Sequence, residues 1–397
     1  MNYNDFNLLN QNIVYLDNGA TTLKPKVLSE AISDYYNNYS ANAHRGDYDM
    51  SLKVDTMYEK TRTLVKELIN AKSEKEIVFT SGATDSLNKI IFGYAKNILN
   101  EEDEVLITKA EHASNILPWF ELSDQIGIKV KYIDLTDDYK VTLDNVKKSI
   151  TAKTKVISLA HITNVVGDVR PLEEIIEYAH KKNILVIVDG AQAVAHKPID
   201  VQKLDIDFLA FSAHKMCGPT GVGVLYGKEE LLKNMMPIIL GGGMNASFEE
   251  DSTRVYSELP HRFEAGTPNI AGVIGFGRVL EYLLDIGMEK INNYEQELRK
   301  YAISKLKKNN NLIIYNENSE SGIITFNYHN VFSQDLAIYL NKYNICVRAG
   351  NHCAKILKNE IGVKNTCRVS LYFYNTKDDI DKLVDALNNE NLINEII

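Results

Sequence analysis

The chain has 397 residues, too many for one compact core, so two domains are expected. Hydrophobic residues make up 45% and charged residues 24%, which is ordinary for a globular protein. The net charge of -9 argues against broad binding to nucleic acid or to an anionic membrane. The sequence contains no apolar run of about 18 residues, so no membrane span is predicted.

The first residues and the cysteines bear on the cellular compartment. The stretch MNYNDFNLLNQN is polar and lacks the basic and apolar regions of a signal peptide. None of the four cysteines, Cys217, Cys346, Cys353 and Cys367, forms a CxxC pair, so the usual zinc and dithiol spacings are absent. We therefore expect a cytoplasmic protein with free thiols and no metal centre.

Between residues 105 and 226, short apolar runs alternate with helical patterns. A helix is expected around 172–181. The apolar runs are 105–107, 130–133, 156–160, 184–188, 208–211 and 222–226. Short apolar runs separated by helices indicate a largely parallel sheet covered on both faces, and hence an α/β fold.

After about residue 280 the pattern changes. A charged helical pattern runs over 281–308, an alternating run follows at 323–326, and a final helix is expected from Thr376 onward. These features predict a smaller α+β domain. We place a large domain at 16–284 and a small domain at 1–15 and 285–397.

Polar residues follow several of the apolar runs. In an open parallel sheet, ligands sit beyond the carboxyl ends of the strands, so these residues predict a site at one edge. In chain order they are Glu111, His112, His161, Asn164, Asp189, Gln192, Ser212, His214 and Lys215. Polar residues are common at strand ends, so a single one would not indicate a site. The prediction rests on their recurrence after several strands.

Asp189 and Lys215 each have two explanations. Asp189 directly after five aliphatic residues is typical of an Asx-turn or helix cap, while a buried carboxylate would need a cationic partner. The pair can be a salt bridge. Alternatively, both can hold one ligand, with the carboxylate on a cationic ring nitrogen and the amine on an aldehyde, as in a pyridoxal 5′-phosphate site.

A phosphate site should accompany such a cofactor. The stretch 80–88 has small and hydroxyl residues, follows the apolar 77–79, and precedes a helix, so its N-terminus can bind a phosphate. An ordinary helix cap has the same composition. Likewise, His112 is either a core histidine or an imidazole that lies flat on an aromatic cofactor.

Nine stretches connect the chain to a known family. They are YLDNGATT (15–22), NAHRG (42–46), FTSGATDSLN (79–88), EHASNILPW (111–119), VDGAQAVAH (188–196), FSAHKMCGPTG (211–221), FEAGTPN (263–269), RAGNHCA (348–354) and CRVSLYFYNT (367–376). Over nearly its whole length the chain resembles the class V aminotransferases of the fold-type I pyridoxal-phosphate enzymes. It is most similar to the Suf-type (group II) cysteine desulfurases. This implies a mostly parallel, seven-stranded sheet covered by helices, plus a small α+β domain.

The resemblance also implies roles for individual residues. Lys215 would bond the cofactor aldehyde, Asp189 would pair with the pyridinium nitrogen, Gln192 would reach the phenolic oxygen, and His112 would stack on the ring. The phosphate would be held by Ala83, Thr84, Ser212 and His214. Thr267 would reach the phosphate of the other subunit in a homodimer. The substrate carboxylate would be bound by Asn164, Arg348 and Arg368.

Cys353 decides which chemistry the family resemblance implies. A buried cysteine packing as a small hydrophobe is the common case. However, Arg348, Gly350 and His352 beside it favour an accessible, thiolate-prone sulfur, and its place in RAGNHCA matches the persulfide-forming cysteine of the family. Many relatives have His-His-Cys where this chain has Asn351-His352-Cys353.

The expected activity is that of a cysteine desulfurase, a sulfurtransferase that converts L-cysteine to L-alanine and leaves a persulfide on Cys353. His112 is expected to assist proton transfer. The sulfur would pass to a small acceptor protein of the Suf system for iron–sulfur cluster assembly. The alternatives are selenocysteine lyase, cysteine sulfinate desulfinase, a transaminase, or a non-catalytic scaffold, although a scaffold would be expected to lose Lys215 or Cys353.

Overall fold

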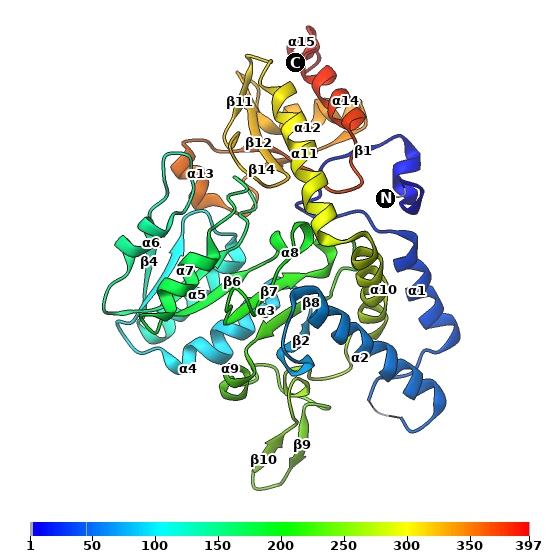
Figure 1. Ribbon diagram of the computed structural model, residues 1–397, viewed down its shortest axis with the longest axis vertical. Helices are drawn as coiled ribbons and strands as arrows, with labels where there is room; N and C mark the ends of the chain where they lie inside the picture. Colours follow the sequence, from blue (N-terminus) through cyan, green and yellow to red (C-terminus); the bar gives the residue numbers. More distant parts are fainter. Residues whose placement is uncertain (1–2, 45, 397) are drawn as a thin grey trace.

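The computed structural model describes residues 3–44 and 46–396, and its centre is a seven-stranded sheet (Figure 1). Only one of its strands, β8, runs against the other six. In spatial order the strands are β2 (Ile77–Thr80), β8 (Gly223–Gly227), β7 (Phe208–Ser212), β6 (Leu185–Asp189), β5 (Thr154–Ala160), β3 (Glu104–Thr108) and β4 (Lys129–Ile133). The predicted mostly parallel sheet is therefore confirmed.

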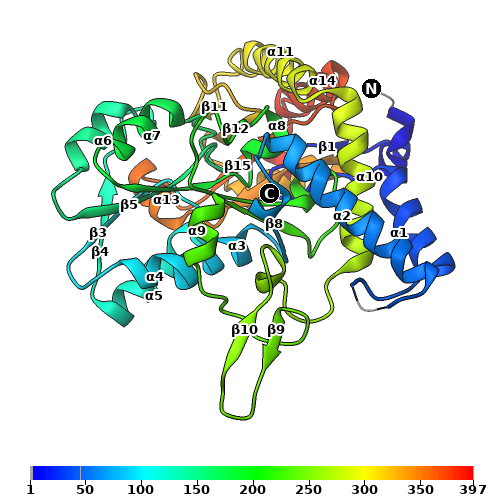
Figure 2. The ribbon, with the colours of Figure 1, turned by 60° about the horizontal axis from the view of Figure 1, so that its bottom comes forward.

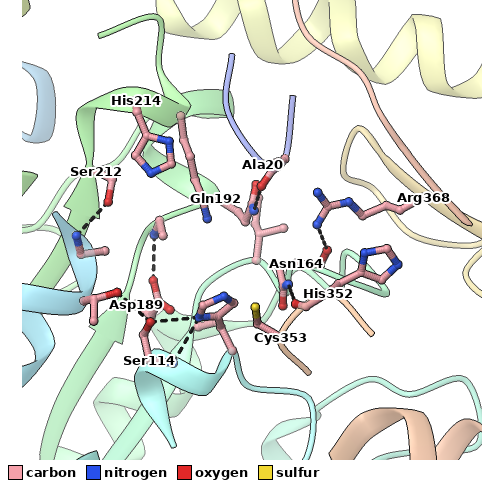
Figure 3. Close-up of a pocket in the computed structure, with 18 of the residues that line it drawn as sticks. Ala20, Ser114, Asn164, Asp189, Gln192, Ser212, His214, His352, Cys353 and Arg368 are labelled. Carbon is pink, nitrogen blue, oxygen red and sulfur yellow. Dashed lines mark hydrogen bonds between the residues drawn. The ribbon is translucent and has the colours of Figure 1, made fainter. Parts of the chain in front are cut away.

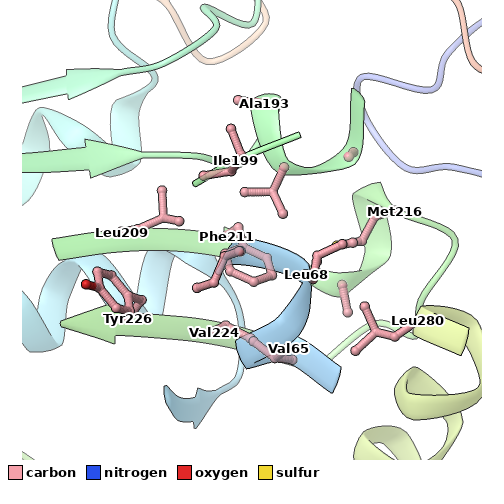
Figure 4. Packing of buried hydrophobic residues seen from close by; sticks show 14 of the residues in the cluster. Val65, Leu68, Ala193, Ile199, Leu209, Phe211, Met216, Val224, Tyr226 and Leu280 are labelled. Atoms are coloured by element: carbon pink, nitrogen blue, oxygen red, sulfur yellow. The ribbon is translucent and has the colours of Figure 1, made fainter. Parts of the chain in front are cut away.

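Helices cover both faces of this sheet because alternate residues of each strand point to opposite sides. In β7, Leu209 and Phe211 belong to the apolar core on one face, whereas Phe208 and Ala210 belong to the core on the other. Figure 4 shows the first of these cores. It is formed with α1 (Lys26–Asn38), α2 (Asp49–Ile69), α6 (Leu143–Ser149), α7 (Leu172–His180), α8 (Ala193–His196) and α10 (Ile270–Ile286).

The opposite face is covered by shorter helices. Trp119 and Leu122 of α5 pack there against Val105 and Ile107 of β3, and all four side chains are fully buried. The helices of this face are α3 (Ala83–Ile90), α5 (Leu117–Ile126) and α9 (Glu229–Asn234), and the exposed turn α4 (Lys96–Ile98) lies between two residues of the same core, Ala95 and Leu99. Two apolar layers thus fix the strands, and with them the polar residues at their ends.

A second, antiparallel sheet lies above the first in Figure 1. Its strands are β11 (Leu312–Ile314), β12 (Ile323–Tyr328), β15 (Thr366–Ser370) and β14 (Arg348–Gly350), in that order. The helices of this part are α11 (Met288–Leu306), α12 (Ser333–Lys342), α13 (Lys355–Ile361), α14 (Lys377–Leu387) and α15 (Leu392–Ile396). Strand β1 (Val14–Tyr15) joins this part by pairing in parallel with β13 (Ile345–Cys346).

The expected single helix over 281–308 is wrong. Gly287, with a φ of 90°, separates α10 from α11, because this left-handed conformation cannot continue a helix. The break lies close to the expected division at residue 284. The division into 16–284 and 1–15 with 285–397 stays a prediction, and residues 1–2 and 397 lie outside the described residues.

A two-stranded hairpin, β9 (Asn245–Phe248) and β10 (Arg254–Tyr256), projects from the body of the chain (Figures 1 and 2). Over residues 3–44 and 46–396, none of the helices combines the length and apolar composition that crossing a membrane requires. All four cysteines are free thiols.

Candidate active site

A cavity of about 240 Å³ lies at the carboxyl ends of β5, β6 and β7, where the two parts of the chain meet. It contains every predicted site residue except Thr267. The predicted residues that line it are Ala83, Thr84, His112, Asn164, Asp189, Gln192, Ser212, His214, Lys215, Arg348, Cys353 and Arg368. Figure 3 shows most of these side chains pointing toward a common space.

Lys215 and Asp189 come from adjacent strands of the sheet. Asp189 ends β6, and Lys215 stands in the 3-10 turn Ala213–Lys215 after β7. The Asp189 carboxylate accepts a hydrogen bond from the Ala191 N–H at 2.9 Å, which is an Asx-turn. In the described part of the chain, the two side chains form no ion pair shorter than 4.0 Å. The acid is therefore turned toward the cavity without being neutralised by the lysine.

Burial sets the protonation of this pair. It lowers the pKa of the Lys215 amine to about 8, and the nearby Asp189 opposes that shift. Burial also raises the pKa of Asp189, while the Ala191 N–H and Lys215 oppose the rise. A buried amine with a lowered pKa is a better nucleophile and base than a solvated lysine near neutral pH.

Small and hydroxyl residues surround one end of the cavity. Ala83 begins α3, and its backbone N–H donates to Ser212 Oγ at 2.7 Å. Ser212 is buried, so its hydroxyl is held at the helix N-terminus. The turn depends on two glycines, because a Cβ on Gly223 would lie 2.4 Å from Gly82 Cα. This end can bind a phosphate through N–H and hydroxyl groups.

His112 lies across the cavity in its neutral form. Burial, reinforced by Lys215, lowers its pKa to about 4. Its Nδ1 accepts a hydrogen bond from the Ser114 N–H at 3.1 Å, which fixes the tautomer with the proton on Nε2. The Ser114 hydroxyl in turn contacts the Thr84 hydroxyl at 2.7 Å. Ser114 was not predicted, although a hydroxyl two residues after His112 is a local signal for it.

The Gln192 amide has one satisfied atom and one free atom. Its Nε2 donates to the Gly19 carbonyl at 2.9 Å, whereas the buried Oε1 has no hydrogen-bond partner in the described chain. Leaving a buried polar atom unpaired costs about 1–3 kcal/mol, so the free atom indicates a ligand group. Burial and Lys215 lower the pKa of the adjacent His214 to about 4.

Two arginines of the second sheet reach the same cavity. Arg368 of β15 is buried; its Nη1 donates to the Asn164 carbonyl at 2.9 Å and its Nη2 to Asp17 Oδ1 at 3.2 Å. Its buried Nε has no partner among the described residues. Arg348 of β14 is more exposed and contacts Asp17 Oδ2 at 3.7 Å. This arrangement can bind a carboxylate.

Cys353 is exposed and stands on a loop between β14 and α13. Residues His352 and Cys353 both have left-handed φ angles, of 54° and 56°, which non-glycine residues rarely adopt. Two hydrogen bonds from the other part of the chain hold this loop: Asn164 Nδ2 to the His352 carbonyl at 2.7 Å, and the Ala113 N–H to the Cys353 carbonyl at 2.9 Å. In Figure 3 the Cys353 sulfur points toward the other side chains.

Some expected residues behave differently. Thr267 is exposed and does not line the cavity, as a residue that serves another subunit would not. Arg45, in the quoted stretch 42–46, lies outside the described residues. His352, expected to favour a thiolate at Cys353, lines the cavity but is buried; burial lowers its pKa to about 2 and its Nε2 lies 3.0 Å from Thr366 Oγ1, so it carries no positive charge near neutral pH. Cys217 and Cys367 are buried and Cys346 is half-buried.

Comparison with known proteins decides the family. The model of the family "Aminotransferase class-V" matches residues 14–383. The chain belongs to this family. A probable cysteine desulfurase of Halalkalibacterium halodurans is 42% identical over 375 residues, which cover 94% of this chain and 92% of that protein. A cysteine desulfurase of Haloferax volcanii is 40% identical, and the match covers 94% of this chain and 88% of that protein.

The solved structures agree with this family assignment. The crystal structure of the cysteine desulfurase CsdA of Escherichia coli, in an S-sulfonic acid form, superposes with a TM-score of 0.93 and 37% identity over 100% of both chains. A cysteine desulfurase of Thermococcus onnurineus also gives a TM-score of 0.93, with 34% identity over 97% of this chain and 96% of its own. The predicted α/β fold is thereby confirmed.

Membership of the family indicates pyridoxal 5′-phosphate as the cofactor, and the cavity fits it. Lys215 offers an amine for the aldehyde, Asp189 a carboxylate for the ring nitrogen, and the unpaired Oε1 of Gln192 a partner for a ring substituent. The N-terminus of α3 with Ser212 offers donors for the phosphate.

Proposed function

We propose that this chain is a cysteine desulfurase that converts L-cysteine to L-alanine and keeps the sulfur as a persulfide on Cys353. The observation that carries the proposal is the meeting of Cys353 and Lys215 in one cavity, although 138 residues separate them in the sequence. A transaminase needs only the lysine. A thiol on a tethered loop that lines the same cavity favours sulfur transfer.

Pyridoxal 5′-phosphate, when bound, withdraws electrons from the Cα of an amino acid joined to it. The Lys215 Nζ removes the Cα proton, because burial keeps a fraction of the amine unprotonated near neutral pH. The Asp189 carboxylate would hold a proton on the ring nitrogen of the bound cofactor. His112 would stack on the bound ring as a neutral imidazole with its proton on Nε2, and would assist proton transfer from there.

Arg368 binds the substrate carboxylate through its unpaired Nε and its Nη2, with Arg348 and the Asn164 side chain beside it. This fixes the substrate sulfur near Cys353. The Cys353 thiolate attacks that sulfur, so that an S–S bond forms while the Cβ–S bond breaks and its electron pair stays on Cβ. Cβ then takes up a proton, and alanine is released, leaving Cys353 as the persulfide.

Further parts of the proposal concern assembly and place in the cell. Thr267 is exposed and outside the cavity, which supports a homodimer in which it reaches the partner's cofactor phosphate. The exposed Cys353 supports transfer of the persulfide sulfur to a small acceptor protein of the Suf system, for iron–sulfur cluster assembly. The free thiols fit a cytoplasmic protein.

The test measures alanine and sulfide released from L-cysteine in the presence of a thiol reductant. We expect Cys353→Ala to lose both products but to keep the yellow colour of the cofactor and its thermal stability, since exposed positions contribute within about 0.5 kcal/mol. Lys215→Ala should lose the borohydride-reducible colour. Cys346→Ala, whose half-buried thiol does not line the cavity, is the matched control.

Full activity in Cys353→Ala would contradict the proposal. The thiol would then be structural, and the activity would have to be that of a lyase or transaminase that forms no persulfide.

A further inference from the structure

The stretch 15–22 contains one acidic residue, Asp17. Asp17 lies two residues beyond the end of strand β1, directly after Leu16. Asp17 does not line the cavity itself, yet it contacts both arginines that do.

Without Asp17, the positive charges of the two arginines would repel each other. Arg348 and Arg368 are direct partners in the antiparallel ladder of β14 and β15. Like charges placed directly opposite each other across two strands repel and destabilise the sheet. The Arg368 side chain is only 2% exposed, so water does little to screen that repulsion.

The Asp17 carboxylate lies between the two guanidinium groups. Its Oδ1 is 3.2 Å from Arg368 Nη2 and its Oδ2 is 3.7 Å from Arg348 Nη1, so each oxygen serves one arginine. Two positive charges and one negative charge leave a net charge of one, which one substrate carboxylate neutralises. Arg348, with 46% of its side chain exposed, is otherwise free to turn into water.

The backbone fixes Asp17 in this place. The Leu16 N–H donates to the Cys346 carbonyl at 2.9 Å, and the Ser370 N–H donates to the Leu16 carbonyl at 2.7 Å. The next residues are held as well: the Asn18 side chain donates to the Ser370 carbonyl at 2.7 Å, and the Gly19 N–H donates to Ser370 Oγ at 2.7 Å. The carboxylate is thus presented by a rigid segment.

Gly19 lies close to the Arg368 guanidinium group on one side. A Cβ on Gly19 would lie 3.1 Å from both Cζ and Nη2 of Arg368, which is tighter than ordinary van der Waals contact, so the absence of a side chain makes room for the guanidinium group. One edge of that plane is bonded to Asn164 and Asp17, and the buried Nε is free. The free Nε is therefore available to a bound carboxylate only while Asp17 holds the plane.

We propose that Asp17 is a positioning residue for the substrate carboxylate: by bridging Arg348 and Arg368, it offsets their repulsion and holds both guanidinium groups toward the cavity. The proposal rests on the proposed function, because it concerns binding of an amino-acid substrate at that site. Asp17 acts through the arginines and touches neither cofactor nor substrate.

The test compares Asp17→Asn, Asp17→Glu, Arg348→Gln and the double variant Asp17→Asn/Arg348→Gln, with KM and kcat measured separately for L-cysteine. Loss of a charge-assisted hydrogen bond should raise KM by about tenfold to a hundredfold in Asp17→Asn, with kcat within about threefold. Asp17→Glu should recover part of the loss. Because the repulsion needs both arginines, the KM penalty of the double variant should be smaller than the product of the penalties of Asp17→Asn and Arg348→Gln.

Asp207→Asn is the matched control. Asp207 also bridges two basic side chains, Lys228 at 2.8 Å and His180 at 2.9 Å. It directly precedes β7, so it lies at the opposite end of that strand from Ser212 and the cavity. The Asp207→Asn variant should have a lower thermal stability and an unchanged KM for L-cysteine. A rise in KM in this control equal to that in Asp17→Asn would overturn the proposal, because the effect would then follow from general destabilisation.

Three other results would also overturn it. A lower KM in Asp17→Asn would mean that Asp17 competes with the substrate for Arg368. An unchanged KM with a lower kcat would place its effect in the chemical step. Multiplying penalties in the double variant would mean that it acts independently of Arg348.

Calorimetric titration with L-alanine separates this proposal from the proposed function. Alanine carries the carboxylate without the sulfur, so its Kd should rise in Asp17→Asn by the same factor as KM. A wild-type enzyme that releases no alanine from cysteine would refute the proposed function, whereas an unchanged alanine Kd in Asp17→Asn would refute the role of Asp17.

Discussion

The loop that carries Cys353 is tethered by Asn164, and removing that tether should have a measurable effect. In Asn164→Ala the hydrogen bond from Nδ2 to the His352 carbonyl is lost, while the backbone carbonyl that binds Arg368 remains. A side-chain hydrogen bond contributes about 1 kcal/mol, so the loop should open about fivefold more often. The neighbouring bond from the Ala113 N–H to the Cys353 carbonyl should open with it, because adjacent residues move together.

Hydrogen exchange of the Ala113 amide reports this opening directly. We expect its exchange rate to rise about fivefold in Asn164→Ala, measured without substrate, because exchange follows the local opening equilibrium. Asn309→Ala is the control, since its side chain makes the same kind of bond, to the Leu387 carbonyl at 2.9 Å, far from the cavity. If Ala113 exchanges equally fast in wild type and in Asn164→Ala, the side chain does not tether the loop.

Two further predictions concern packing and pH. Gly223→Ala should lower the stability by about 1–3 kcal/mol and weaken cofactor retention, since the new methyl group would overlap Gly82; an unchanged Tm would contradict this close contact. His180 hydrogen-bonds Asp207 and Asp205, and the bond to Asp207 raises its pKa. The stabilisation is complete below the ordinary value near 6.5 and is lost as pH rises through the folded pKa. The decline in unfolding free energy above about pH 6.5 should be smaller in His180→Gln, and an equal decline would refute the assignment.

The large sheet and its polar edge could be predicted because their signals are local. An aliphatic run is followed at once by Asp189, and an apolar run, 208–211, is followed by Ser212 and Lys215. Each pattern indicates both a strand and the place where it ends. The structure adds what those signals leave open: the Asp189 carboxylate makes an Asx-turn and still lines the cavity, so the two explanations are compatible.

No comparable local pattern in the sequence indicates the helix break at Gly287 or the role proposed for Asp17. A single glycine in a charged helical pattern costs only about 1 kcal/mol, so the pattern alone favours one continuous helix over 281–308. Asp17 gains its meaning from Arg368, which lies 351 residues later in the sequence. Contacts of that separation leave no periodicity, and only the three-dimensional structure reveals them.

The pairing of β1 with β13 has a consequence for how the enzyme matures. Val14 pairs with Ile345, which lies 331 residues later in the sequence, so the pairing must close a very long loop. Such distant pairings form late, because the entropy of closing a long loop must be paid first. A partly synthesised chain can assemble the sheet that holds Lys215, but it has neither the arginine pair nor Cys353. The cavity is therefore complete only after the later segments, which carry β13, β14, Cys353 and β15, have joined the large sheet.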